Sequence, residues 1–378
     1  MGPFEGTSVE ADVARRLAAA LRGGGVPIST TSYHRDDRDL GSAWSHRGPS
    51  DFPFEVNLLV VHPDQMTDFV LDSGPGLFQG RYTLGLWAWD LQGPSSSMAD
   101  AARMVHEVWT PTSWGSGTAS TVLGGPVHAV PIPVGGEPSG RGRAAVGLPD
   151  GFVIACSVDH DNGFARQNPL GAVHAYTAAF SPADGHHLVI DASHADRYPQ
   201  EHALLVGLAD ARPDVVIRHS SSAAERDRLL ARADCYLSLH RADGNLGSVA
   251  KAMSWGTFTV VTATPASLEF QTDQDSGLVR SETVAVSADE YRYPSGSSWA
   301  DPDLEHASSV LQSVVADPGV TAAMVRRARR VATRRFSPSV AVAAVHARLA
   351  DIETRLHSGQ RSDRVTAARV RDRAGGRR

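Results

Sequence analysis

Apolar residues in the first third of the chain recur first at helical spacing and then in continuous runs. Residues 9–22 place their apolar side chains on one helical face, and the glycines at 23–25 predict the end of that helix. Two continuous apolar runs follow, typical of parallel strands covered on both faces: VNLLVVH (56–62) and YTLGLWAWDL (82–91). We expect a helix over 99–108 and extended segments at WTP and at HAVPIPV (128–134).

The second half alternates more regularly between strand-like runs and helical segments of about ten residues. The predicted strands are FVIACSV, HHLVIDA, DVVIRHS, CYLSLH and FTVVTAT. Such alternation predicts βαβ units with right-handed crossovers, and therefore a Rossmann-like sheet. Helices over 319–336 and 338–355 are expected to follow.

The length of 378 residues exceeds what one hydrophobic core usually supports, so we expect an α/β protein of two domains with a cleft. The segment at 135–151 is rich in Gly, Pro and Arg, which is the composition of a linker, and we place the domain boundary there. The last 18 residues, from Arg361, carry seven Arg against two Asp, and this composition predicts a disordered tail.

Composition narrows the class of protein. A formal net charge of −6 does not favour a nucleic-acid partner. Cys156 and Cys235 each lie in an apolar run, so reduced core thiols are expected, as in a cytoplasmic protein. The N-terminus has no signal-peptide pattern, and no run approaches the roughly 20 apolar residues of a membrane span. The oligomeric state is left open.

The segment CYLSLHRADGNLGSVAKAMSWGTFTVVTATPASLEF (235–270) resembles the sugar-nucleotide site of glycosyltransferase family 4, whose pattern is S-x-H-R-x-E-G-F-G-L-x-x-x-E-A-M-x-x-G followed by L-E-F. Matching positions are Ser238, His240, Arg241, Gly244, Ala252, Met253, Gly256, Leu268, Glu269 and Phe270. The likeness extends to SVDHDNGFARQNPLGAVHAYTAAF (157–180) and HEVWTPTSW (106–114), and covers roughly residues 1–350.

The resemblance implies a GT-B fold, in which two Rossmann-like domains face each other across a cleft. The expected parts are an acceptor domain (1–134), a linker (135–151), a nucleotide-sugar domain (152–336), a helix that crosses back to the first domain (337–356) and a tail (357–378). It also implies transfer of a hexosyl-type unit with retention, without metal or other cofactor. The donor would be a nucleoside-diphosphate sugar, and the acceptor a small molecule or a glycan.

Three departures from the family pattern fall on functional positions. Asp243 stands where the family has a Glu beside the donor sugar. Lys251 replaces the Glu that holds the ribose in the family, and Gln167 replaces a Lys that binds the diphosphate, although Arg166 remains. The glycine spacing also differs, because the loop reads Gly244-Asn245-Leu246-Gly247.

Chemistry supports a donor site in this loop. Glycines between a strand and a helix expose backbone N–H groups at the positive end of the helix dipole, which suits a diphosphate. Preorganised cations relieve the charge that develops on the leaving group, so Arg166 is the predicted phosphate ligand. His240 and Arg241 end the preceding strand, and the resemblance implies that they support the site, either through a contact of His240 or with His240 as a structural histidine.

Lys251 is the sole lysine of the chain and lies early in a predicted helix, where the helix dipole disfavours a cation. Three interpretations are open: a contact with the donor diphosphate, an ion pair with Asp243, or a solvated surface position.

The predicted acceptor side lies at the carboxyl ends of two strands of the first domain. Trp87 and Trp89 share one face at strand spacing, where they would either stack on a sugar or pack in the core. His62 and Asp64 follow the neighbouring strand. Asp90 would either accept a hydrogen bond from the incoming hydroxyl or cap a loop.

A second hypothesis is a GT-B homologue that has lost transfer activity and acts as a binding or assembly partner, which Lys251 and Gln167 favour. An NAD-dependent oxidoreductase is not supported, because no G-x-G-x-x-G follows the first strand.

Overall fold

The computed structural model describes residues 1–6, 8–35, 42–44, 52–88, 90–91, 96–121, 123–138, 142–220, 222–287 and 296–357. The chain forms two compact units. The first comprises Met1–Trp89, Gly93–Pro133 and Phe336–Arg378, and the second comprises Asp90–Gln92 and Val134–Arg335. The predicted tail from Arg361 onward lies outside the described residues.

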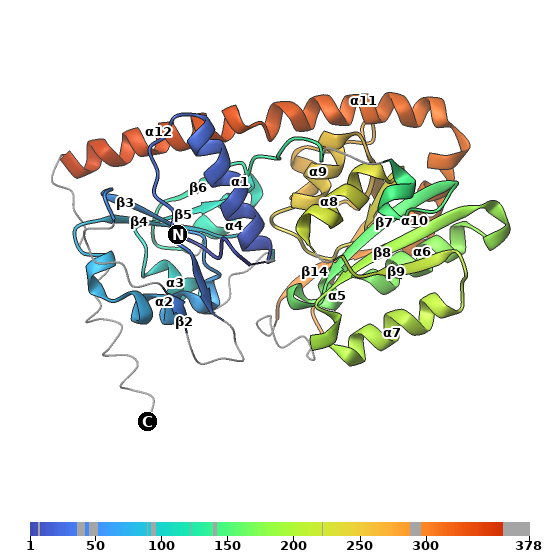
Figure 1. Cartoon of the computed structure of the whole chain (residues 1–378), viewed down its shortest axis with the longest axis horizontal. Helices are drawn as coiled ribbons and strands as arrows, with labels where there is room; N and C mark the ends of the chain where they lie inside the picture. Colours follow the sequence, from blue (N-terminus) through green and yellow to red (C-terminus); the bar gives the residue numbers. More distant parts are fainter. Residues whose placement is uncertain are drawn as a thin grey trace. The chain divides into compact units, whose positions relative to one another are not determined.

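The first unit is built on a parallel sheet in the order β3-β4-β5-β6 (Figure 1). Its strands are β3 (Val56–Leu59), β4 (Tyr82–Leu86), β5 (Glu107–Thr110) and β6 (Val127–Ala129). A separate antiparallel pair joins β1 (Tyr33–Arg35) to β2 (Ser42–Trp44).

Helices cover both faces of this first sheet. They are α1 (Val9–Gly23), α2 (Met66–Ser73), α3 (Ser96–Ala102), α4 (Ser113–Ser120) and α12 (Pro338–His357). Leu17 of α1 and Val345 of α12 share one core cluster with Val60, whereas Phe69 of α2 packs in a second cluster with Leu59. Because successive side chains of an extended segment point to opposite faces, Leu59 and Val60 place the two clusters on opposite sides of the sheet.

The second unit contains six parallel strands in the order β12-β11-β10-β7-β8-β9. They are β7 (Phe152–Asp159), β8 (His186–Ser193), β9 (Val215–Arg218), β10 (Cys235–Ser238), β11 (Phe258–Thr262) and β12 (Gly277–Val279). The first strand in sequence, β7, lies centrally, and the chain builds outward from it in both directions. This is the strand order of a Rossmann fold, which the sequence predicts.

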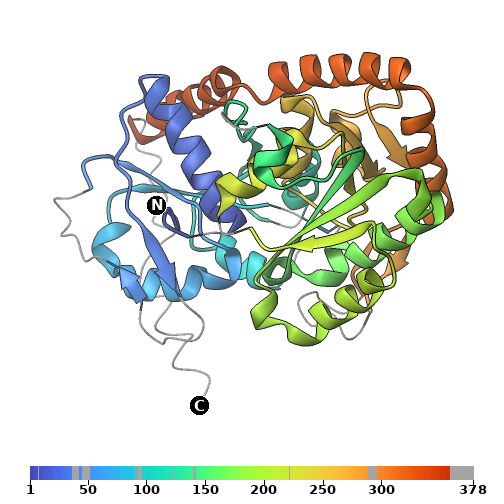
Figure 2. The same ribbon diagram turned by 45° about the vertical axis from the view of Figure 1, so that its right-hand side comes forward.

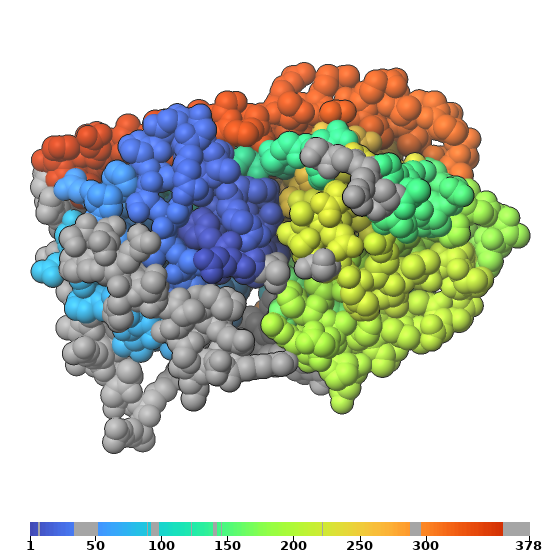
Figure 3. All heavy atoms as spheres, in the orientation of Figure 1, coloured from blue at the N-terminus to red at the C-terminus, as the bar shows by residue number. Residues whose placement is uncertain are grey.

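Helices lie on both faces of the second sheet as well (Figures 1 and 2). One group packs α6 (Pro169–Ala179) against α7 (Pro199–Asp210) and α10 (Leu304–Ala316). The other packs α9 (Gly247–Trp255) against α8 (Ala223–Arg232) and α11 (Pro318–Arg335), and the outer side of α11 lies at the surface (orange in Figure 3). The short helix α5 (Phe164–Gln167) and the hairpin of β13 (Ser281–Ala285) and β14 (Ser298–Pro302) complete the unit.

The predicted elements of the first unit need correction at their ends. The helix expected over 99–108 begins at Ser96 and ends at Ala102, and Glu107 and Val108 belong to β5 instead. Val and Trp favour strands, and a neighbouring parallel strand satisfies their backbone groups. The run 82–91 is a strand only to Leu86. In the second half, β12, the β13–β14 hairpin and α10 were not predicted as elements.

Both cysteines are free and buried, as predicted. Burial raises the pKa of the Cys156 thiol to about 12. Within the part of the chain that the structure describes, no helix is both long and apolar enough to cross a membrane.

Candidate functional site

The predicted donor-site residues meet at the carboxyl ends of β7 and β10, which are neighbours in the sheet. From β7 the chain continues toward β8 on one side, whereas β10 continues toward β11 on the other. Loops diverge at such a switch point, and open α/β sheets bind their ligands in the crevice that results. The segment that follows β7 carries Arg166 and Gln167 in the short helix α5, and the loop that follows β10 carries residues 239–246.

Helix α9 opens toward this switch point with an uncapped N-terminus. It begins at Gly247, and the side chain of its N-cap residue, Leu246, forms no cap hydrogen bond. Leu246 has φ of 48°, a left-handed conformation that is costly for a branched aliphatic residue. The first-turn N–H groups have no acceptors within the helix, so this end presents backbone donors and the positive end of the helix dipole.

Two carboxylates shape the loop that precedes α9. Asp243 Oδ1 accepts hydrogen bonds from the N–H groups of Asn245 (2.9 Å) and Leu246 (2.8 Å). Asp90 Oδ1 accepts from the Gly244 N–H at 2.7 Å. The structure thus brings together Asp90 and Asp243, two residues that the sequence predicts for the reaction.

Arg166 bridges the two loops. Its Nε donates to the carbonyl oxygen of Asn162 at 2.9 Å, and its Nη1 donates to that of Ala242 at 2.6 Å. The same Nη1 lies 3.9 Å from Asp90 Oδ2. The guanidinium is therefore held beside the glycine loop as a preorganised positive charge.

His240 lies beneath the loop with one ring nitrogen that has no partner. The residue is only 2% exposed, and its Nδ1 lies 3.0 Å from Ser238 Oγ. Its Nε2 has no hydrogen-bond partner among the described residues, and the same is true of the buried Asn245 Oδ1. Burial lowers the pKa of His240, which favours the neutral form of the ring. Unpaired buried polar atoms beside a helix N-terminus indicate a place for a polar ligand.

The side chains of Arg241 and Gln167 make structural contacts within the second unit. Arg241 Nε pairs with Asp301 at 2.8 Å, and its guanidinium lies over the Trp299 ring. Gln167 donates through Nε2 to the backbone carbonyl of Asp159 (2.6 Å) and accepts from the N–H of the same residue (2.9 Å). Gln167 therefore holds its own loop, although the sequence suggests a contact with the donor.

Lys251 is buried and paired, which corrects two of the three interpretations of this residue. It is 7% exposed rather than solvated, and its Nζ donates to both Asp227 oxygens, at 2.9 and 3.2 Å. The carboxylate that it binds belongs to Asp227 of α8 rather than to Asp243. Lys251 thus joins α9 to α8, and its ammonium also lies 5.9 Å from the centre of the Trp255 ring.

Replacing Lys251 by alanine is expected to lower the free energy of unfolding of the second unit by about 1.5–3 kcal/mol, the scale of a hydrogen bond to a charged group. Asp227 keeps partial access to water, which limits the cost of leaving it unpaired. Urea denaturation measures the effect. The double variant Lys251→Met/Asp227→Leu, which removes both charges, should recover part of the loss, and a single variant as stable as the parent would contradict this assignment.

The predicted acceptor residues belong to the first unit, with the exception of Asp90. Trp87 is 2% exposed and packs in the core with Leu59 and Phe69, so the structure assigns it to packing rather than to sugar stacking. His62 and Asp64 are exposed and form a local turn, in which His62 Nδ1 accepts from the Asp64 N–H at 3.3 Å. Trp89 lies outside the described residues.

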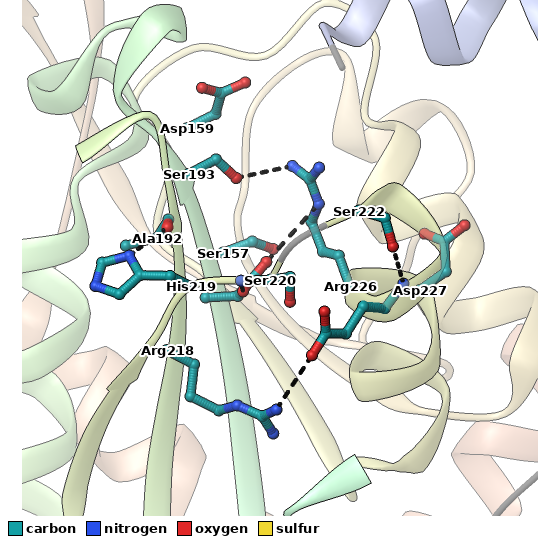
Figure 4. A network of polar contacts seen from close by, with 12 residues as sticks. Ser157, Asp159, Ala192, Ser193, Arg218, His219, Ser220, Ser222, Arg226 and Asp227 are labelled. Carbon is teal, nitrogen blue, oxygen red and sulfur yellow. Dashed lines mark hydrogen bonds and ion pairs between the residues drawn. The ribbon is translucent and has the colours of Figure 1, made fainter. Parts of the chain in front are cut away.

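A polar network that the sequence did not reveal lies at the carboxyl ends of β8 and β9 (Figure 4). Arg226 reaches from α8 to Ser193 Oγ at 3.1 Å, and its Nε lies 3.8 Å from Asp191. Asp191 is fully buried, and its Oδ2 and the Ser220 Oγ accept or donate no hydrogen bond among the described residues. The sequence offered one indication of this network: Asp191 and Ser193 are polar residues at the end of an apolar strand.

A second polar cluster that the sequence did not reveal consists of Asp159, Asp161 and His194. One carboxylate oxygen of each aspartate and one ring nitrogen of the histidine lie within 4.8 Å of one another. His194 Nδ1 lies 2.7 Å from Asp159 Oδ1, and Arg197 pairs with Asp161 at 2.7 Å. A hydrogen-bonded Asp–His pair with a guanidinium at the second carboxylate accounts for all three side chains. The backbone of His194 is left-handed, with φ of 55°.

The pKa of His194 is raised above 6.5, first by its hydrogen bond to Asp159 and then by the charges of Asp159 and Asp161, while burial opposes the shift. A raised pKa stabilises the folded protein fully below about pH 6.5, and this stabilisation is lost as the pH rises through the pKa of the folded state. The variant His194→Asn, which tolerates the backbone conformation, should therefore lose more stability at pH 6 than at pH 9. Chemical denaturation at the two pH values tests this, and an equal loss would contradict it.

The sequence matches no protein-family model and no curated protein sequence. Solved structures share the fold. Sucrose-phosphate synthase from Thermosynechococcus elongatus superposes with a TM-score of 0.64 at 12% identity, over 92% of this chain and 94% of that chain. HepE from Anabaena, in complex with UDP and glucose, gives 0.60 at 13% identity, over 88% and 89%.

A TarM variant from S. aureus, in complex with fondaparinux, α-GlcNAc-glycerol and UDP, gives a TM-score of 0.54 at 9% identity. The match covers 76% of this chain and 53% of TarM, so this chain spans about half the length of that protein. At such identities the likeness concerns the fold alone. It confirms the predicted fold class, since the chain has two Rossmann-like units and the GT-B fold.

Proposed function

We propose that the chain is a glycosyltransferase of family 4 that transfers a hexosyl-type unit from a nucleoside-diphosphate sugar to a hydroxyl group, with retention and without a metal ion. The observation that carries this proposal is that the Arg166 guanidinium is held against the loop that leads into the N-terminus of α9, at the β7–β10 switch point. Helix N-termini and guanidinium groups are the typical protein partners of phosphate.

In the proposed reaction, the bond between the anomeric carbon and the diphosphate oxygen breaks, and a bond to the acceptor oxygen forms on the same face. Negative charge develops on the leaving diphosphate, where Arg166 and the first-turn N–H groups of α9 stabilise it. The acceptor hydroxyl loses its proton to a base, and we assign this role to Asp90. Asp243 fixes the loop through the N–H groups of Asn245 and Leu246.

The network of Arg226, Ser193 and Asp191 offers further polar contacts for the nucleoside part of the donor. It lies at the same carboxyl edge of the sheet, and α8 carries both Arg226 and Asp227, the partner of Lys251. Two proteins of related fold support the proposal of a nucleoside-diphosphate sugar donor. HepE and the pneumococcal O-GlcNAc transferase GtfA were both solved with UDP and a sugar. A cytoplasmic location remains part of the proposal.

Three contacts favour the second candidate, a GT-B homologue that binds a partner without transferring sugar. The Lys251 ammonium pairs with Asp227, and the Gln167 amide donates to the backbone carbonyl of Asp159. The Gly244 N–H donates to Asp90. Lys251 and Gln167 stand at positions whose family residues bind the donor, and the Gly244 N–H belongs to the loop that is predicted to bind the diphosphate.

Calorimetric titration with a panel of nucleotides separates the two candidates. The proposed function requires that at least one nucleoside diphosphate, UDP and GDP being the first to test, binds in the presence of EDTA. Retention is then tested by NMR of the sugar that slow donor hydrolysis releases, because an α-linked donor should yield the α-anomer first. If no nucleotide binds, the non-catalytic candidate is favoured.

A further inference from the structure

The glycine loop holds an anion that comes from the chain itself. The Gly244 N–H donates to Asp90 Oδ1 at 2.7 Å, and the other oxygen of this carboxylate lies 3.9 Å from Arg166 Nη1. One backbone donor and one guanidinium are also the partners that a phosphate oxygen would take here. The Asp90 side chain remains 31% exposed, so the carboxylate lies at the mouth of the loop.

The neighbouring residue holds Asp90 in place. Leu91 is 6% exposed and packs in a small apolar cluster with Ala242, next to the loop, and with Trp299 of β14. Asp90 and Gly244 are 154 residues apart in the sequence. By contrast, the N–H groups of Asn245 and Leu246 donate to Asp243, a residue of the loop itself. Asp90 is therefore the carboxylate that can leave without unfolding the loop.

We infer that Asp90 is a displaceable latch: it occupies the anion position of the glycine loop until an anionic ligand replaces it. The Gly244 N–H carries one proton and serves one strong acceptor. A phosphate beside Arg166 would also lie next to the Asp90 carboxylate, and the two negative charges repel. An incoming phosphate must therefore expel Asp90, so the latch lowers the affinity of the loop for anions.

That the displacing anion is the diphosphate of the donor rests on the proposed function. In that case, donor binding releases Asp90 from Gly244 and frees its carboxylate for the acceptor hydroxyl. Donor binding and the availability of the base would then be coupled through one hydrogen bond.

The experiment compares the parent with Asp90→Asn and Asp90→Ala by calorimetric titration, with inorganic pyrophosphate and UDP as probes. Alanine removes the competing acceptor, and asparagine keeps an acceptor but removes the charge. We expect pyrophosphate affinity to rise about tenfold in Asp90→Ala, which corresponds to about 1.4 kcal/mol, and by less in Asp90→Asn. The control Glu282→Gln removes one exposed negative charge from β13 of the same unit and should leave the affinity near that of the parent.

A further variant tests the latch without altering the carboxylate. Leu91→Ala weakens the anchoring of the segment and should also raise pyrophosphate affinity, and thermal melting verifies that each variant is folded. Equal or weaker pyrophosphate binding in both Asp90 variants would overturn the inference, as would a rise of the same size in Glu282→Gln. If the Asp90 variants gain affinity for pyrophosphate but nothing binds UDP or another nucleotide, the latch stands and the proposed function fails. If UDP binds the parent and all variants equally, the proposed function stands and the latch is wrong.

Discussion

Replacing Arg348 by alanine is expected to destabilise the first unit by about 3–5 kcal/mol, because it would leave a fully buried carboxylate without its counter-ion. The Glu107 side chain is 0% exposed, and Arg348 donates to its two oxygens from Nε (3.0 Å) and Nη2 (2.8 Å). Trp109 Nε1 donates to the same carboxylate at 2.7 Å, and the Tyr82 hydroxyl donates to it at 3.3 Å. These neutral donors would remain in Arg348→Ala, but they cannot neutralise the charge.

Guanidinium denaturation monitored by tryptophan fluorescence measures this loss. Arg103→Ala is the matched control, since Arg103 pairs with Asp100 at the surface and such pairs contribute about 0–1 kcal/mol. The double variant Glu107→Gln/Arg348→Met should recover much of the stability, because it removes both charges and keeps an acceptor for Trp109. A loss in Arg348→Ala no larger than that in Arg103→Ala would contradict the prediction.

The second large effect concerns ligand binding. Arg166→Ala is expected to weaken nucleoside-diphosphate binding by about 1.5–3 kcal/mol, which is roughly 10–150-fold in Kd. The guanidinium supplies a charge-assisted hydrogen bond to phosphate and also joins the two loops through Asn162 and Ala242. Its removal therefore lowers both the attraction and the preorganisation of the site.

Titration with UDP and UMP locates the contact. If Arg166 binds the β-phosphate, UDP loses more affinity than UMP in Arg166→Ala. Arg280→Ala is the control, because this arginine is 72% exposed and pairs with Asp303 in the same unit. An equal loss for both nucleotides would show that Arg166 is not the β-phosphate ligand.

Strands β7 to β11 of the second unit were predictable because their signals are local. Strands β7, β8 and β11 are buried apolar runs of five to eight residues, and helices with their caps and glycines separate them. The shorter strands of the first unit were predicted too long. Val60 and Val61 are as apolar as Leu59 and as deeply buried, yet the strand ends at Leu59. The pattern of apolar residues indicates which residues are buried. Where a strand ends depends instead on where a neighbouring strand offers hydrogen-bond partners.

By itself, the sequence determined the two-unit α/β architecture, the Rossmann-like second sheet and the place of the glycine loop, because hydrophobic period and glycine position act over a few residues. Only the tertiary structure decided the partners of charged side chains. Lys251 binds Asp227 rather than Asp243, Arg348 binds Glu107 across 241 residues, and Asp90 reaches Gly244 across 154. A basic side chain pairs with the carboxylate that the fold places beside it, and the burial of that ion pair, which depends on segments far apart in the sequence, determines how much free energy the pair contributes.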